Sequence, residues 1–216
     1  YLTLYKKNAL KTTINKESSP LLIIYAHHQP EASTMPMGGE YPSHVDLIIQ
    51  LRAKGYQNTI FYKEHPSVFC YLFGDNNEIK DVDRIGLHRS REYLENLYKL
   101  KCEVLPIKFR IDQNKNSSEM FVPVTITGNI ALERSLFGLS TIVFGNPWWK
   151  KMPGIIHIDN IKSLEKVDKK WTIPNPSIIK DSKIWLKNTL NNKTVKNSMG
   201  VAYKKKFISE EDIELT

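Results

Sequence analysis

The sequence has few cysteines and no long apolar run. Only two cysteines, Cys70 and Cys102, occur in 216 residues, and their spacing matches neither a zinc site nor a disulfide-rich secreted domain. We therefore expect two buried thiols in a reducing cytoplasm. No apolar stretch approaches the roughly 18 residues that a membrane span needs. Any contact with a membrane is therefore expected to be peripheral.

Signatures of several common enzyme classes are also missing. The sequence contains no Walker loop, no G-x-G-x-x-G or G-x-S-x-G motif, no kinase signature and no zinc-ligand spacing. A metal is therefore not indicated, and we expect no cofactor. Basic residues outnumber acidic ones by 31 to 23, which gives a formal charge of +8 and favours anionic partners. Because the basic residues are scattered and not interleaved with aromatic ones, nucleic acid is the least favoured of these partners.

Short apolar runs alternate with segments of helical spacing along most of the chain. Runs rich in β-branched and aromatic residues predict six strands, at 21–27, 59–64, 102–109, 122–127, 140–145 and 154–158. Helical spacing of apolar residues predicts helices at 43–54, 90–101, 129–138 and 175–192. Most of the strands are apolar throughout, as parallel strands covered on both faces are. The sequence therefore predicts an α/β fold with a doubly wound parallel sheet of about six strands flanked by helices.

The chain divides into three predicted segments. Residues 1–19 read as a polar linker with room for one helical turn, residues 20–160 as the sheet domain, and residues 161–216 as a helical extension with a tail. The first residue is Tyr1 rather than Met, and we interpret the chain as a segment of a longer protein.

Polar residues gather directly after the first predicted strand. In an open parallel sheet, ligands bind beyond the carboxyl ends of the strands, so these residues are candidates for a site. His28 and Glu31 are candidate catalytic proton acceptors, and Gln29 and Thr34 can bind a substrate by hydrogen bonds. The alternative is that such residues only tie down their own loop.

The second predicted strand ends in the sequence YKEHP. Lys63 can meet a phosphate as a point charge and His65 by a hydrogen bond, beside a turn fixed by Pro66. A surface histidine before a proline usually has no function. The position of this one after a strand makes it a candidate.

The sequence TITGN marks a third candidate, where a strand runs into a helix. Backbone amides at a helix start are typical of an anion site; Thr127 adds a hydroxyl, Asn129 a polar side chain, and Gly128 permits close backbone approach. Glu133, one turn further along, could bind the two hydroxyls of a ribose. The alternative, slightly favoured by this motif alone, is a helix capped by Thr or Asn with a solvent-exposed glutamate.

Two adjacent tryptophans follow a Gly-Asn-Pro turn. Trp148 could stack on a base or a sugar ring. A hydrophobic plug under the sheet is the commoner fate of such a pair and stays open as the alternative.

Taken in order, the motifs HHQPEAST with MGGEY, then YKEHP, then VTITGNIALERSLFGLSTIVFGNPWW resemble the bacterial capsule polysaccharide biosynthesis family, which includes Kdo transferases. The resemblance covers roughly residues 20–160. It implies a glycosyltransferase of the GT-B type, and this chain would be its carboxyl-terminal, Rossmann-like half, which holds the nucleotide-sugar donor.

The resemblance also implies a reaction and roles for single residues. A sugar would pass from a nucleotide-activated donor, such as a CMP-Kdo-like one, to a glycan or glycolipid acceptor in the cytoplasm or peripherally at the inner membrane. His65 and Pro66 would contact the nucleotide phosphate, Gly128 would lie by the phosphate or nucleotide, and Glu133 would bind the ribose. The segment from Gln29 to Glu31 would face the cleft between the two domains.

Two positions depart from the usual family pattern. Asn129 stands where threonine is common, and Arg134 stands where a small residue usually follows the glutamate. Together with the charge of +8, these departures keep a second hypothesis open, a non-catalytic interaction domain in capsule assembly or export. A nucleotide-sugar epimerase of the same two-domain fold is the third hypothesis.

Overall fold

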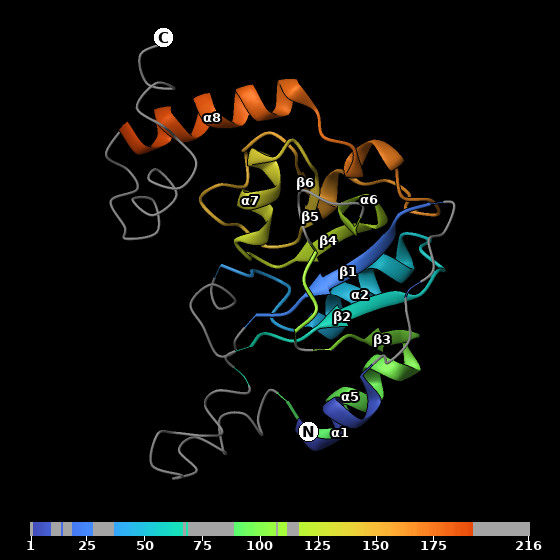
Figure 1. Cartoon of the computed structure of the whole chain (residues 1–216). Coiled ribbons are helices and arrows are strands. Elements are labelled where there is room, and N and C mark those ends of the chain that lie inside the picture. The colour runs from blue at the N-terminus through green and yellow to red at the C-terminus, as the bar shows by residue number, and fades with distance from the viewer. Residues whose placement is uncertain are drawn as a thin grey trace, which may run out of the picture.

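A computed structural model describes residues 2–9, 14, 19–27, 37–66, 68, 89–106, 108–111 and 117–191. Within these ranges, six parallel strands form one sheet in the order β3-β2-β1-β4-β5-β6 (Figure 1). The strands are β1 (Leu21–Tyr25), β2 (Ile60–Lys63), β3 (Cys102–Val104), β4 (Phe121–Thr125), β5 (Thr141–Val143) and β6 (Ile155–His157). This is the strand order of a Rossmann-type, doubly wound sheet. The predicted fold class is confirmed.

The winding of the sheet reverses at β1. Leu22 of β1 pairs with Ile60 of β2 on one side and with Val122 of β4 on the other. The chain therefore builds β1, β2 and β3 outward in one direction and then returns to add β4, β5 and β6 on the opposite side. Ligands of such sheets bind beyond the strand ends at this reversal, so the carboxyl ends of β1 and β4 are where a site is expected.

Helices cover both faces of the sheet (Figure 1). α2 (His44–Ala53) and α5 (Arg91–Lys99) pack on one face, and α7 (Ile130–Leu136) and α8 (Pro176–Asn191) pack on the other. Ser43 and Ser90 cap the first two helices, because their side chains accept the amides of Val45 and Tyr93. None of the helices within the described ranges is both long and apolar enough to cross a membrane.

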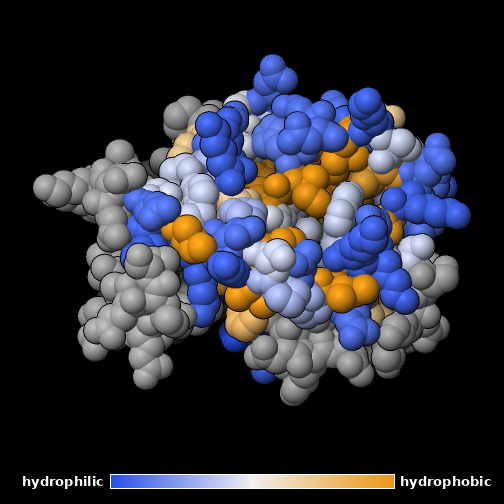
Figure 2. Space-filling view, turned by 90° about the horizontal axis from the view of Figure 1, so that it is seen from above, coloured by the Kyte–Doolittle hydropathy of each residue, from blue (hydrophilic) through white to orange (hydrophobic). Residues whose placement is uncertain are grey.

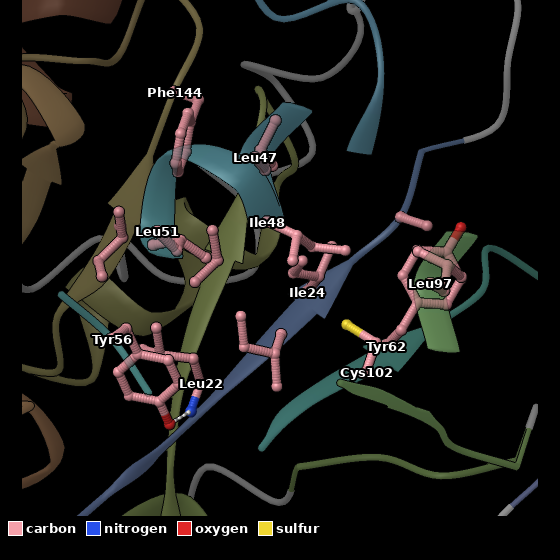
Figure 3. Packing of buried hydrophobic residues seen from close by; sticks show 14 of the residues in the cluster. Leu22, Ile24, Leu47, Ile48, Leu51, Tyr56, Tyr62, Leu97, Cys102 and Phe144 are labelled. Atoms are coloured by element: carbon pink, nitrogen blue, oxygen red, sulfur yellow. Dashed lines mark hydrogen bonds between the residues drawn. The ribbon is translucent and has the colours of Figure 1, made fainter. Parts of the chain in front are cut away.

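The main core lies between the sheet and α2. Figure 3 shows Leu47 and Leu51 of α2 close to Leu22 and Ile24 of β1, all four fully buried. The Tyr56 hydroxyl accepts the amide of Leu22 at 3.1 Å, which satisfies a strand donor inside the core. A smaller apolar cluster packs on the other side of the same strands and contains Leu21, Ile23, Phe61 and Phe121. β1 is therefore apolar on both faces, as its sequence predicts.

The core extends past residues 20–160 in both directions. The stretch predicted as a linker contains α1 (Leu2–Asn8), whose Tyr5 is completely buried. The Tyr5 hydroxyl donates to the carbonyl of Leu105 at 2.7 Å and accepts the amide of Glu64 at 3.1 Å. After β6, the short helices η1 (Ile158–Asn160) and η2 (Lys169–Thr172) flank three residues of the main core: Ile161, Leu164 and Val167. Both flanks thus pack with the sheet.

One predicted strand is shorter than expected. The run 102–109 is apolar, but β3 ends at Val104. Pro106 has no amide to donate to a neighbouring strand, and its carbonyl accepts the amide of Phe109 at 2.9 Å in a turn. The chain therefore leaves the sheet here and returns through the one-turn helix α6 (Ser117–Met120) to β4.

Candidate functional site

The carboxyl ends of β1, β2 and β4 bring several predicted site residues to one edge of the sheet. Backbone pairing continues past the strands: the amide of Ala26 donates to the carbonyl of Lys63 at 2.9 Å, and that of Gly145 to Ile126 at 2.8 Å. The segments that follow the strands therefore start from fixed positions. His65, Thr127 and Gly128 lie on these segments, as the sequence predicts.

His27 joins the ends of β1 and β4. Its Nε2 atom accepts the amide of Thr127 at 3.1 Å, and the side chain is buried. Gly128 lies against it and donates its own amide to Thr125 Oγ1 at 3.0 Å. A Cβ atom on Gly128 would come within 2.5 Å of that Oγ1, so the turn needs glycine. Two amides of the predicted anion turn are thus already used inside the protein, and an anion here would depend on other donors.

Backbone amides fix two buried histidines in the neutral form. The amide of His27 donates to Nε2 of His44 at 3.0 Å, just as the amide of Thr127 donates to Nε2 of His27. A backbone amide can only donate, so both Nε2 atoms are unprotonated and both rings carry their proton on Nδ1. The two rings stack at 5.6 Å between centroids. This arrangement assigns both tautomers from backbone contacts alone.

The environment agrees with neutral rings. Burial, with added effects of the charges on His65 and Arg89, lowers the pKa of His27 to about 4. Burial, with Arg89 and His27, lowers the pKa of His44 well below its ordinary value. Neither imidazole carries a charge at neutral pH, so both act in hydrogen bonding rather than in charge stabilisation.

The hydrogen bonds continue from His44 to a carboxylate. His44 Nδ1 lies 3.3 Å from the Tyr93 hydroxyl, which lies 3.3 Å from the Tyr62 hydroxyl, and Tyr62 donates to Glu64 Oε2 at 3.1 Å. With the tautomers assigned above, each member of the chain can donate to the next, from His27 to Glu64. The chain connects the end of β1 with the end of β2.

A buried ion pair ends this chain. Arg89 donates from Nε to Glu64 Oε2 at 2.6 Å and from Nη2 to Oε1 at 3.1 Å, and less than a twentieth of either side chain is exposed. The same Nη2 also donates to the carbonyl of His27 at 3.0 Å. Such bidentate, buried contacts are rigid and cost much to break. We name His27, His44, Tyr62, Glu64, Arg89 and Tyr93 the paired network.

His65 follows this network at the end of β2. Its backbone amide donates to Glu64 Oε1 at 2.9 Å, its carbonyl accepts the amide of Val68 at 3.1 Å, and its side chain is half-buried. Pro66, next in the chain, is exposed. His65 is close enough to His27 for its charge to lower the pKa of that ring. It therefore lies between the paired network and the solvent.

Lys63 and Glu133 lie around Tyr25, the last residue of β1. The Lys63 amine lies 5.4 Å from the centre of the Tyr25 ring. Burial raises the pKa of Tyr25 to about 12, and the nearby charges of Arg134 and Glu133 also act on it. Glu133 is half-buried on α7. Asn129 makes no side-chain cap for this helix, so the Asn cap considered for it is not formed.

Arg134 has a structural place. Its side chain is fully buried, and Nε donates to the carbonyl of Ser140 at 3.0 Å while Nη2 donates to that of Trp171 at 3.4 Å. The amide of Ser140 donates to the same Trp171 carbonyl. Burial lowers the pKa of Arg134 to about 10, which leaves it charged at neutral pH. Arg134 joins α7 to the start of β5 and to η2.

The two tryptophans have different surroundings. Trp149 is buried in the cluster between α7 and α8, as the plug hypothesis predicts. Trp148 is half-buried and stacks on Trp185 of α8 at 5.9 Å between centroids, with the ring planes 17° apart. One face of Trp148 is therefore covered by protein. Stacking of a ligand on Trp148 stays a prediction.

Four candidate residues lie outside the described residues: His28, Gln29, Glu31 and Thr34. The chain is described again from Met37, whose carbonyl accepts the amide of Asn146 beyond β5 at 2.7 Å. Residues 37–40 thus begin beside the end of β5. The candidate catalytic roles of Glu31 and His28 stay predictions.

None of the six residues of the paired network is among the candidate site residues that the sequence predicts. Glu64 stands within the YKEHP motif and directly after a strand, so its position was a usable signal. His44 is the first residue of α2, and Arg89 is distant from Glu64 in sequence. Nothing in the linear pattern pairs these two with the strand ends, because the sheet register brings them there.

The described residues contain no group of three His, Cys, Asp or Glu side chains placed to hold a metal ion. The chain matches no protein-family model, no curated protein and no solved structure. Membership of the capsule polysaccharide family stays a prediction.

Proposed function

We propose that this chain is the donor-binding domain of a glycosyltransferase that uses a nucleotide-activated sugar in bacterial capsule or surface polysaccharide synthesis. One observation carries the proposal: the Rossmann-type strand order reverses at β1, and the candidates Lys63, His65, Thr127 and Gly128 lie at the ends of the two neighbouring strands, β2 and β4. In sheets of this order, nucleotides bind at that reversal. The motif order that resembles the family points to the same strand ends.

The proposed reaction needs positive charge and hydrogen-bond donors around the leaving nucleotide. In transfer of a sugar, negative charge develops on the departing phosphate, and fixed donors stabilise it. His65 would donate to a phosphate oxygen beside the turn at Pro66, and Lys63 would add charge. Glu133 would accept from ribose hydroxyls, with Asn129 and the Thr127 hydroxyl beside it.

The acceptor side of the proposal involves the segment after β1. Glu31 or His28 would accept the proton of the acceptor hydroxyl, and Gln29 and Thr34 would hold the donor sugar or the acceptor. The acceptor would be a glycan or glycolipid, and the work would take place in the cytoplasm or peripherally at the inner membrane. No metal or cofactor has a part in this proposal.

Nucleotide binding is the first test. A nucleotide that binds only the folded protein stabilises it in proportion to RT ln(1 + [L]/Kd), about 2.7 kcal/mol at 100 times Kd. We expect CMP, CTP or another nucleotide to raise the melting temperature, and His65→Ala to remove most of the shift. His157→Ala is the matched control, since it removes an imidazole at the end of β6, where His157 contacts Gly145 and Asp159. Absence of a shift with every nucleotide would overturn the proposal.

A second candidate function is a non-catalytic interaction domain that contacts anionic lipid or polysaccharide. Residues 141–191 carry nine lysines against four acidic side chains, a net charge of +5. Figure 2 looks down on the side where α8 lies and shows hydrophobic patches bordered by hydrophilic side chains. This candidate predicts sedimentation with vesicles of anionic lipid, unchanged by His65→Ala and Glu133→Ala and absent with neutral lipid.

A further inference from the structure

Lys63 has an unusual place for a lysine. It is the last residue of β2, and only 8% of its surface is exposed. Side chains alternate along a strand, so Lys63 points to the same face as Phe61, away from α2 and the paired network. On that face it lies beside its register partner Tyr25, with the amine 5.4 Å from the ring centre. Lysine is rarely buried to this degree without a partner.

A second cation, Arg110, belongs to a segment that contacts the same tyrosine. Arg110 belongs to the segment that returns from β3 towards β4, and this segment is fixed on both sides of it. The amide of Ile111 donates to the Tyr25 hydroxyl at 3.4 Å, and the ring of Phe109 packs on that of Phe121 at 5.8 Å between centroids. Arg110 is exposed, and together with burial its charge lowers the pKa of Lys63.

No acid neutralises these two cations within the part of the chain that the structure describes. Neither the Lys63 amine nor the Arg110 guanidinium has a hydrogen bond or an ion pair to any described residue. Glu64 is the acid whose charge acts on Lys63, and its carboxylate is bound by Arg89 in the paired network. Like charges held together repel each other, so an anion between them would remove an unfavourable interaction.

We propose that Lys63 and Arg110 bind an anionic group of the substrate, a phosphate or a carboxylate, over the ring of Tyr25. The guanidinium of Arg110 can hold two oxygens at once, and the Lys63 amine adds a point charge. The site uses the face of β1 and β2 that carries the smaller apolar cluster, and not the amides of Thr127 and Gly128, which are already used. This inference rests on the proposed function, because the anion is assigned to a nucleotide-sugar substrate at this strand edge.

The test compares each anionic probe with its neutral counterpart by isothermal titration calorimetry. CMP, UDP and GDP are each measured against the corresponding nucleoside, which isolates the phosphate. Glucuronate is measured against glucose, which isolates a sugar carboxylate. The variants are Arg110→Gln and Lys63→Met, which keep most of the side-chain length, and the control is Lys108→Gln, an exposed lysine of the same segment. Circular dichroism verifies that Lys63→Met folds. If Lys63→Met does not fold, Arg110→Gln, which alters an exposed side chain, is sufficient for the test.

We expect Arg110→Gln to lower the affinity for the anionic probe by roughly tenfold or more and to leave the affinity for its neutral counterpart unchanged. If the variant loses affinity for a nucleotide, the bound group is a phosphate. If it loses affinity for glucuronate, the bound group is a carboxylate. If a nucleotide binds wild type and both variants equally, the inference is wrong and the proposed function stands. If no nucleotide binds but glucuronate or inorganic phosphate binds in a manner that depends on Arg110, the anion site stands and the proposed function is wrong. Equal binding of all anions by all variants overturns the inference.

Discussion

The two faces of the sheet differ in how charged side chains are paired at the ends of β1 and β2. On the face covered by α2 and α5, the charged pair Glu64 and Arg89 is buried and each partner is held by the other. On the opposite face, the Lys63 amine lies over the Tyr25 ring, Arg110 directly precedes Ile111, whose amide donates to the Tyr25 hydroxyl, and neither cation is paired with a described acid. A paired buried network stabilises one geometry, whereas unopposed cations leave positive potential for a ligand. The comparison separates residues that hold the strand ends from residues that can bind.

The largest effect is expected from breaking the buried pair. Glu64→Gln keeps the shape of the side chain but leaves Arg89 with an uncompensated charge in the core. We expect a loss of about 3–5 kcal/mol in the free energy of unfolding, measured by urea denaturation. The exposed pair Arg91 and Glu95, with contact at 2.7 Å, is the control, and Glu95→Gln should cost less than about 1 kcal/mol. Similar losses for both changes would contradict the distinction between the two kinds of pair.

The paired network should also make stability depend on pH. The pKa of His27 is about 4 in the folded protein, below the ordinary value of about 6.5. A lowered pKa means that the stability contributed by the neutral ring is complete above pH 6.5 and is lost as pH falls from there to 4. The shift corresponds to roughly 3 kcal/mol.

The measurement is the free energy of unfolding from pH 8 to pH 4 in wild type and in His27→Gln. Glutamine can accept the amide of Thr127 but cannot take up a proton in this range. The variant should therefore lose less stability between pH 6.5 and 4 than wild type does. If the free energies of unfolding of wild type and variant change in parallel with pH, His27 is not the cause of the pH dependence.

A smaller effect is expected at the seam between β1 and β4. Gly128→Ala would place a Cβ atom 2.5 Å from Thr125 Oγ1 and should cost about 1–3 kcal/mol through strain. Thr125→Ala removes the atom that clashes, so the double variant should cost less than the sum of the two single changes. Additive costs in the double-mutant cycle would show that the contact with Thr125 is not the cause.

The sequence predicts the sheet well because its strands are continuous apolar runs. The strands β1, β2, β5 and β6 lie within their predicted ranges and β4 begins one residue before its own, with ends that differ by at most two residues. β3 is the exception, since periodicity alone does not register that Pro106 ends the pairing. Tyr5 was missed for another reason. A single aromatic residue in a polar stretch gives no periodic signal, and its burial depends on contacts with Leu105 and Glu64 that only the folded chain brings together.

The candidate site was predictable where a residue follows its strand directly. His65, Thr127 and Gly128 reach the same edge because they come just after β2 and β4. Arg89 and Arg110 come from connecting segments, and the sheet register decides what they face. The sequence therefore indicates which edge of the sheet carries polar groups, but not how charges are paired on its two faces.

The smallest expected effect is a gain in stability rather than a loss, and it tests directly whether the two faces of the sheet differ. Arg110→Gln removes one of two neighbouring cations, so the repulsion on Lys63 falls and no described partner is lost. In buffer free of phosphate and other multivalent anions, we expect the free energy of unfolding to stay unchanged or to rise by roughly 0.5 kcal/mol or less. Lys108→Gln controls for the change in net charge. With an anionic ligand present, the order should reverse, because wild type gains stability from binding that Arg110→Gln cannot gain fully. A clear loss of stability without ligand would show that Arg110 already has a structural role, and the two faces of the sheet would then not differ as described.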